Sequence, residues 1–210
     1  MSKIARKKPV RRKSVRPKPV RPKIPRDPAA TAAALLDAAE REFNAHGFDG
    51  TDTNRIARAA GYAPQTFYRH FDDKRAVFLA VYERWWTSES GALAAAAASG
   101  HPPGGEEAAR IALAFHTKWR GFRRALRHLA IVDPKVRAAR TVARQAQIAR
   151  IRDYAGAGTR SDRELAAALL KTERICDAAA EGELADLGLT VQDIRILVAD
   201  AMAELVGSRA

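Results

Sequence analysis

The segment APQTFYRHF, residues 63–71, holds the side chains best suited to chemistry in this chain. On a helix that turns about 100° per residue, apolar side chains gather on one side: Ala63, Pro64, Phe67 and Phe71. Polar side chains gather on the other side: Gln65, Tyr68 and Arg69, with Thr66 on the flank. Gln pairs with adenine edges, Thr with a base or a thymine methyl group, and Tyr and Arg with phosphates or guanine. The polar side therefore has the chemistry of a DNA-reading surface, although an ordinary solvated helix face has a similar composition.

The segments before residue 63 predict two helices that would position this surface. Residues 28–46 carry apolar side chains at helical spacing, with Asp27 as a cap and Gly47 as the stop. A short helix follows within residues 51–61, capped by Thr51 or Asp52 and stopped at Gly61. A short helix, a glycine turn and a second helix have the spacing of a helix-turn-helix.

The remainder of the chain also has helical periodicity. We predict a helix over residues 72–98 with Asp72 or Asp73 as cap, and helices over 105–130, 133–154, 161–185 and 190–206. No segment alternates with the period of two that marks a strand. The predicted fold is therefore all-α, with an N-terminal three-helix DNA-binding domain followed by a helical C-terminal domain.

The segments LLDAAEREFNAHGFDGT and IARAAGYAPQTFYRHFDDK, within residues 31–81, resemble the DNA-binding domain of the TetR family of bacterial transcription regulators. The family landmarks occur with the family spacing over about a quarter of the chain. The resemblance implies a helix-turn-helix, a connecting helix, and a variable C-terminal domain for ligand binding and dimerisation. It also implies a ligand-responsive regulator, usually a repressor, and not an enzyme.

The resemblance and the helical projection together give a set of expected DNA contacts. They are Thr51, Thr53, Gln65, Thr66, Tyr68, Arg69, His70 and Lys74. Lys74 opens a helix, where its charge opposes the helix dipole, so a phosphate opposite it would offset the cost. Ala63 stands where the family usually has a capping Ser, so the recognition helix is expected to lack a cap of about 1 kcal/mol.

The positive charge of the chain lies almost entirely in residues 1–26. This segment has twelve Lys and Arg, five Pro and no acidic residue, which leaves 25 basic against 24 acidic residues in the rest of the chain. Proline and like-charge repulsion favour disorder here. We expect either a DNA arm that supplies affinity or a solubilising extension. The predicted domains are thus residues 1–26, 27–74 and 75–210.

Aromatic residues of the C-terminal domain are the candidates for an effector pocket. The expected ligand contacts are Trp86, Phe115, His116, Trp119 and Phe122. Phe115, Trp119 and Phe122 share one helix face, a pattern that core packing also produces. His116 and His128 do not have metal-ligand spacing with a carboxylate, and Cys176 is expected to be a buried thiol. The sequence predicts no metal site and no cofactor.

The last helix carries an apolar stripe made of Ile194, Leu197, Ala201 and Leu205, with Val198 beside it. Such a stripe packs either within the chain or against a second copy. The resemblance implies a homodimer through this helix and the one over 161–185, bound to a palindromic duplex DNA operator and released by a small apolar or aromatic effector. The chain is expected to be cytoplasmic and free of membrane contact. A low-specificity architectural protein that binds DNA through the basic tail is the alternative.

Overall fold

The computed structural model describes residues 27–102, 104–153 and 160–207. Ten helices occupy these ranges, and no strand occurs among them, so the prediction of an all-α fold is confirmed. The helices are α1 (Pro28–His46), α2 (Thr53–Ala59), α3 (Pro64–Phe67), α4 (Lys74–Ala98), α5 (Glu106–Lys118), α6 (Arg120–Val132), α7 (Pro134–Arg152), α8 (Asp162–Glu181), α9 (Glu183–Asp186) and α10 (Val191–Val206). The basic segment 1–26 lies outside the described residues.

Side-chain caps set the starts of the N-terminal helices. Asp27 accepts a hydrogen bond from Ala29 N at 2.9 Å, Asp52 from Arg55 N at 2.8 Å, and Asp73 from Ala76 N at 2.7 Å. Each cap satisfies a backbone N–H that a helix start leaves unpaired. These contacts decide between the paired candidates in the sequence: the second of each pair, Asp52 and Asp73, is the cap.

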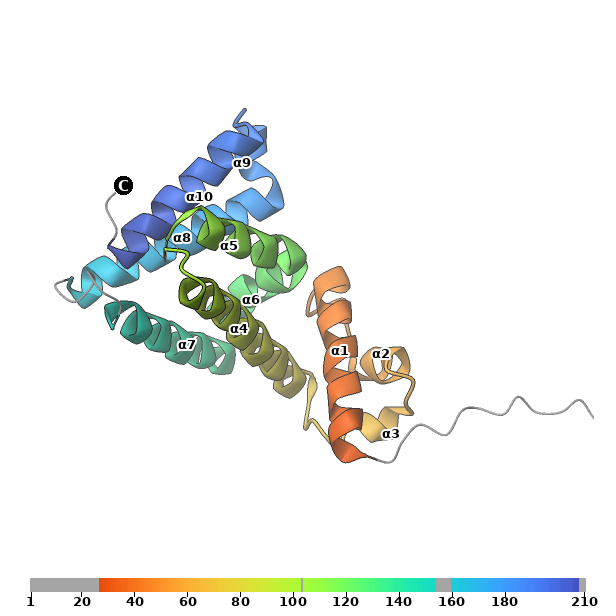
Figure 1. Cartoon of the computed structure of the whole chain (residues 1–210). Coiled ribbons are helices and arrows are strands. Elements are labelled where there is room, and N and C mark those ends of the chain that lie inside the picture. The colour runs from red at the N-terminus through yellow and green to blue at the C-terminus, as the bar shows by residue number, and fades with distance from the viewer. Residues whose placement is uncertain (1–26, 103, 154–159, 208–210) are drawn as a thin grey trace, which may run out of the picture.

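Helix α4 leads from the small domain formed by α1–α3 to the larger helical domain (Figure 1). The two parts share one core, in which Phe43, Phe67, Phe78 and Phe122 are all fully buried. The rings of Phe78 on α4 and Phe122 on α6 stack with their centroids 4.6 Å apart. The predicted boundary at residues 74 and 75 therefore falls at the start of a helix that contributes to both parts.

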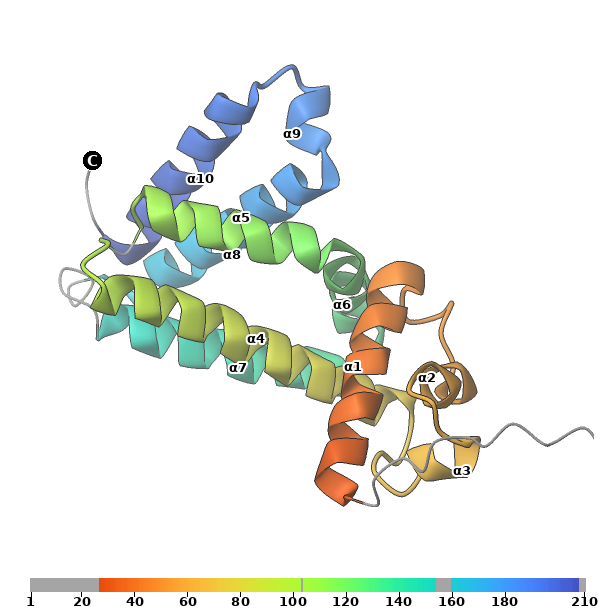
Figure 2. The ribbon, with the colours of Figure 1, turned by 45° about the vertical axis from the view of Figure 1, so that its right-hand side comes forward.

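The larger domain places α8 and α10 side by side, at the end of the molecule away from α3 (Figures 1 and 2). Three members of the predicted α10 stripe, Val198, Ala201 and Leu205, are buried within the chain, whereas Ile194 and Leu197 are half-buried. Ile196 on the same helix is 50% exposed. The stripe is thus largely part of the protomer's own core. None of the helices in the described ranges is both long and apolar enough to cross a bilayer.

Two of the helices predicted from sequence are interrupted. The segment 105–130 divides at Trp119 into α5 and α6, and the segment 161–185 divides at Gly182 into α8 and α9. Gly182 has a φ of +88°, a left-handed conformation that ends a helix and that glycine adopts without a steric cost. The break at Trp119 has no such local cause; it depends on a contact from α1 that is described below.

Candidate DNA-binding surface and effector cavity

Helices α2 and α3 form a helix-turn-helix whose first helix is fixed to α1. The side chain of Arg55 on α2 pairs with Glu42 and lies 2.5 Å from His46 Nε2, both on α1. The turn between α2 and α3 passes through Gly61, whose φ is +82°. Helix α3 begins at Pro64, and Ala63 before it makes no side-chain cap. The predicted absence of a cap on the recognition helix is therefore confirmed.

The predicted division of the recognition segment into two sides agrees with the burial of its side chains except at Ala63, which is exposed. Phe67 is fully buried and Phe71 is half-buried against the same core. Gln65, Tyr68 and Arg69 are exposed, and Thr66 and His70 are half-buried. The helix proper is only four residues long, but backbone hydrogen bonds continue its turn as far as Phe71. The polar side chains therefore project from one continuous hydrogen-bonded segment.

Tyr68 and Thr53 join the recognition helix to α2. Their hydroxyl oxygens lie 2.9 Å apart in a hydrogen bond, and Tyr68 is 57% exposed. Each hydroxyl has further hydrogen-bonding capacity after this bond is made. The bond fixes the orientation of two predicted DNA contacts, so both can meet a phosphate or base without first losing much side-chain freedom.

Two of the expected DNA contacts make hydrogen bonds within the protein. Thr51 is 2% exposed, and its hydroxyl donates to Glu42 O at 3.2 Å. Lys74 Nζ donates to Phe48 O at 2.8 Å and to Thr51 O at 3.0 Å, and it lies 4.0 Å from the centre of the Phe48 ring. The hydrogen bonds to these two carbonyl oxygens offset the unfavourable interaction of the lysine charge with the helix dipole. These bonds hold the loop before α2, and contact of Thr51 and Lys74 with DNA stays a prediction.

An apolar cavity lies among α4, α5, α7, α8 and α10. It consists of two adjoining spaces of about 190 and 50 Å³. Five of the lining residues are common to both spaces: Glu89, Leu93, Gln147, Met202 and Leu205. A space with mostly apolar walls and a few polar groups is the usual form of a ligand site, and this one is smaller than the volume of about 300–1,000 Å³ that is common for such sites.

The aromatic residues expected around the effector divide between this cavity and the core. Trp86 lines the larger space and His116 the smaller. Trp119 and Phe122 do not line either space, because they are buried in the core that α1, α4 and α6 share, and Phe115 packs against that core. Phe115, Trp119 and Phe122 thus take part in the core packing that their spacing also allowed, rather than lining this cavity.

A buried ionic network forms the polar end of the cavity. Asp177 accepts hydrogen bonds from His116 Nδ1 at 2.9 Å and from Arg123 Nε at 2.5 Å. Arg127 Nη1 also lies 2.6 Å from Asp177 Oδ2, in an ion pair that lacks hydrogen-bond alignment. Although burial alone would raise the pKa of Asp177, the hydrogen bonds from His116 and Arg123 hold it far below its usual value. Asp177 is therefore a fixed negative charge.

Glu89 is a carboxyl group on the wall of both spaces, and sequence reasoning gave it no role. Burial lowers the pKa of His116 to about 4, so its ring is neutral. The ring hydrogen is on Nδ1, which faces Asp177, and the lone pair of Nε2 therefore faces Glu89 Oε1, 3.7 Å away. Burial also raises the pKa of Glu89 to about 7. The position of Glu89 four residues after Trp85 was the available signal, because i and i+4 share a helix face.

The other polar residues singled out in the sequence have ordinary surroundings. Cys176 is buried, and burial raises the pKa of its thiol to about 12, which makes it unreactive. His128 is exposed on α6. Within the described part of the chain, no group of three or more His, Cys, Asp or Glu side chains is arranged to hold a metal ion.

The N-terminal helices match a known protein class in sequence. Residues 35–81 match the family model described as bacterial regulatory proteins, tetR family. The HTH-type transcriptional repressor SCO4008 of Streptomyces coelicolor is 39% identical over 59 residues, 28% of this chain and 31% of that protein. The HTH-type transcriptional repressor AcnR of Corynebacterium efficiens is 33% identical over 54 residues, 26% of this chain and 29% of that protein. The matches thus span about a third of each curated relative.

The whole fold has solved counterparts. A protein assigned to the TetR family from Rhodococcus sp. superposes with a TM-score of 0.63 at 16% identity, covering 85% of this chain and 99% of that one. The fatty acid degradation regulator FadR of Bacillus halodurans gives a TM-score of 0.55 at 15% identity, covering 84% and 94%. Residues 35–81 are therefore a helix-turn-helix domain of the TetR type, and the described residues have the fold of the two solved regulators. Regulators of the TetR family are DNA-binding transcription factors rather than enzymes.

Proposed function

We propose that this protein is a homodimeric transcriptional repressor that binds a palindromic DNA operator and releases it when a small, largely apolar effector enters the cavity. The observation that carries the proposal is the pairing of an exposed DNA-reading turn with an apolar cavity in one continuously packed chain. The three curated relatives that match the DNA-binding domain are all named as repressors, which supports the direction of regulation.

The reading surface in this proposal consists of Gln65, Thr66, Tyr68 and Arg69, with Thr53 and His70 beside them. Gln65 and Arg69 carry the groups that pair with base edges, and Tyr68 and Thr53 carry hydroxyl groups suited to phosphates. Two such surfaces, related by a two-fold axis, would meet successive major grooves about 34 Å apart. A two-fold symmetric operator follows from that geometry.

The effector in this proposal enters the space lined by Trp86, Leu93 and Met202, with Glu89 at its polar end. The effector would favour one arrangement of the helices around the cavity, and α4 and α6 would carry the change to α1–α3 through the shared core. An effector shifts the equilibrium only as far as it binds one arrangement better than the other.

Dimerisation is proposed through the exposed sides of α8 and α10. These helices pack against each other in the protomer, and α10 still exposes Ile196. A pair of helices from each of two copies would form a four-helix interface, and the two-fold symmetry would fix the separation of the reading surfaces.

The test is a footprint on a site selected from random DNA. A protected two-fold symmetric site of short length, lost on adding a compound that also raises the melting temperature of the protein, supports the proposal. Protection spread evenly over any duplex would favour the alternative of low-specificity binding through the basic segment 1–26. Gln145→Ala, a change at an exposed position on α7, should leave the footprint unchanged and is the control for the Gln65→Ala variant described in the Discussion.

A further inference from the structure

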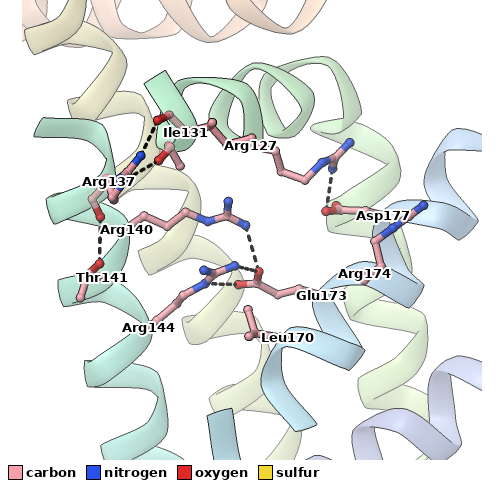
Figure 3. Close-up of a pocket in the computed structure, with 11 residues that line it drawn as sticks. Arg127, Ile131, Arg137, Arg140, Thr141, Arg144, Leu170, Glu173, Arg174 and Asp177 are labelled. Carbon is pink, nitrogen blue, oxygen red and sulfur yellow. Dashed lines mark hydrogen bonds and ion pairs between the residues drawn. The ribbon is translucent and has the colours of Figure 1, made fainter. Parts of the chain in front are cut away.

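A second hollow in the molecule, separate from the reading surface, lies between α6, α7 and α8 and has a volume of about 470 Å³. Figure 3 shows guanidinium groups reaching into it from α6 and α7, with Glu173 and Asp177 facing them from α8. Five arginines line it: Arg127, Arg137, Arg140, Arg144 and Arg174. We call this hollow the arginine groove.

Positive charge exceeds negative charge at the arginine groove. Glu173 and Asp177 are the two carboxylates in its lining, and both are already shared: Glu173 pairs with Arg140 and Arg144, and Asp177 with Arg123 and Arg127. Glu181 and Glu183 pair with arginines at the edge. Arg124 pairs with Glu181, and Arg137 bonds only the backbone carbonyls of Ala130 and Ile131. With Arg123 and Arg124 added to the five lining arginines, the described residues thus place seven guanidinium groups beside four carboxylates.

Arg140 shows the effect of this excess most clearly. Its side chain is only 11% exposed, and it makes one hydrogen bond to Glu173, at 3.0 Å. The pKa of Arg140 is lowered, first by burial and then by the positive charges of Arg144 and Arg123, even though Glu173 opposes the shift. A guanidinium group has five N–H donors, so most of the donors of Arg140 remain available toward the groove.

The geometry points to a binding site for a small, multiply charged oxyanion, either a phosphate ester or a polycarboxylate, in the arginine groove. Guanidinium groups bind phosphate and carboxylate oxygens through paired, charge-assisted hydrogen bonds. The apolar side chains of Ile131 and Leu170 line the same groove and would meet an organic body attached to the anion. This proposal does not depend on the proposed repressor function.

Glu173 lies in the wall between the arginine groove and the inner cavity, because it lines both. An anion that takes Arg140 and Arg144 as partners competes with Glu173 for them. The arginine groove and the cavity therefore share one carboxylate, that of Glu173. An anion bound in the groove would alter the polar wall of the cavity.

The test is calorimetric titration of the full-length protein with pyrophosphate, citrate and acetate at one ionic strength. Saturable binding of pyrophosphate or of citrate, with no binding of acetate, is expected, and the stronger of the two identifies phosphate or carboxylate chemistry. Arg140→Gln should weaken that binding about tenfold, because one charge-assisted contact is lost. Arg163→Gln, at an exposed arginine outside the groove on α8, is the matched control and should not change the affinity.

The basic segment 1–26 and the DNA-reading surface also attract anions, but they are identical in both variants, so the difference between the variants reports on the groove. Glu173 keeps Arg144 as partner in Arg140→Gln; if that variant does not fold, Arg137→Gln replaces it, with the same expected loss. Equal affinities in the wild type, the groove variant and the control would overturn the proposal, as would the absence of binding by both multiply charged probes. No DNA is present in the titration, so its failure would leave the repressor function untouched.

Discussion

Asn44 on α1 caps the start of α6 through Gly121. The side-chain oxygen of Asn44 accepts hydrogen bonds from Gly121 N at 3.0 Å and from Phe122 N at 3.1 Å, and its Nδ2 donates to Lys118 O at 2.6 Å. A residue of the DNA-binding domain thus supplies the cap that separates α5 from α6. We therefore expect a movement of α6 to reach α1 directly through these bonds.

We predict that Gly121→Ala will destabilise the protein by about 1–3 kcal/mol, the usual cost of overpacking. A Cβ at this position would lie 1.9 Å from Asn44 O, so α1 and α6 would have to separate. Urea unfolding measures the effect. Gly91→Ala in α4 is the control, because a Cβ there meets nothing within 4 Å, and it should stabilise the helix by about 0.5–1 kcal/mol. Equal stability of the wild type and the Gly121 variant would contradict the direct contact.

The hydrogen bond between Thr53 and Tyr68 should couple the two residues in operator binding. Tyr68→Phe and Thr53→Val each remove one hydroxyl of the pair. Once one is removed, the second change should cost less, with a coupling free energy of about 0.5–1.5 kcal/mol. Fluorescence anisotropy on the selected site, for the two single variants and the double variant, measures the coupling. Strictly additive losses would show that the two hydroxyls act independently.

Glu89 should make the stability of the protein depend on pH in a defined direction. Its pKa is raised by burial from 4.5 to about 7, so the folded state holds the proton more tightly than the unfolded state. The stabilisation is complete below about pH 4.5 and is lost as the pH rises through 7, amounting to up to about 3 kcal/mol.

Comparison with Glu89→Gln isolates this contribution. His116, whose pKa is lowered, contributes with the opposite sign, but it is present in both proteins. The wild type should lose stability relative to Glu89→Gln between pH 4.5 and 7.5 when both are unfolded in urea. Parallel curves over that range would mean that Glu89 is ionised in the folded protein.

Placing a charge on the exposed side of α10 should separate the proposed dimer. Ile196→Asp puts a carboxylate on a side chain that is half-exposed in the protomer and would be covered in the dimer. Val142→Asp on α7, where the side chain is 65% exposed, is the matched control and should remain dimeric. Sedimentation velocity distinguishes the two. A dimeric Ile196 variant would place the interface elsewhere.

The basic segment 1–26 should set the salt dependence of DNA binding, because the rest of the chain is almost neutral. Each phosphate neutralised by the segment adds about −0.9 to the slope of log K against log salt. Replacing residues 2–26 by a neutral Gly/Ser segment of equal length should weaken operator binding and flatten this slope. An unchanged slope would assign the segment a role other than DNA contact.

Local signals in the sequence accounted for the helix starts and the division of the recognition segment, because caps and amphipathic spacing act over a few residues. The break at Trp119 escaped prediction because its cap, Asn44, lies 77 residues before Gly121 in the chain. The aromatic stripe at Phe115, Trp119 and Phe122 could not be assigned to core or cavity without knowing which helices it faces. The bonds of Thr51 and Lys74 within the chain could not be predicted either, because the resemblance gives positions but not hydrogen-bond partners.

Selection of binding sites from random DNA, carried out in parallel with the wild type and with Gln65→Ala, tests the central claim most directly. The wild type should enrich a two-fold symmetric site, and the variant should lose preference at one position of each half-site, a discrimination of about 1–3 kcal/mol. An enriched pool that is identical for both proteins, or a wild-type pool without symmetry, would contradict operator recognition by this surface.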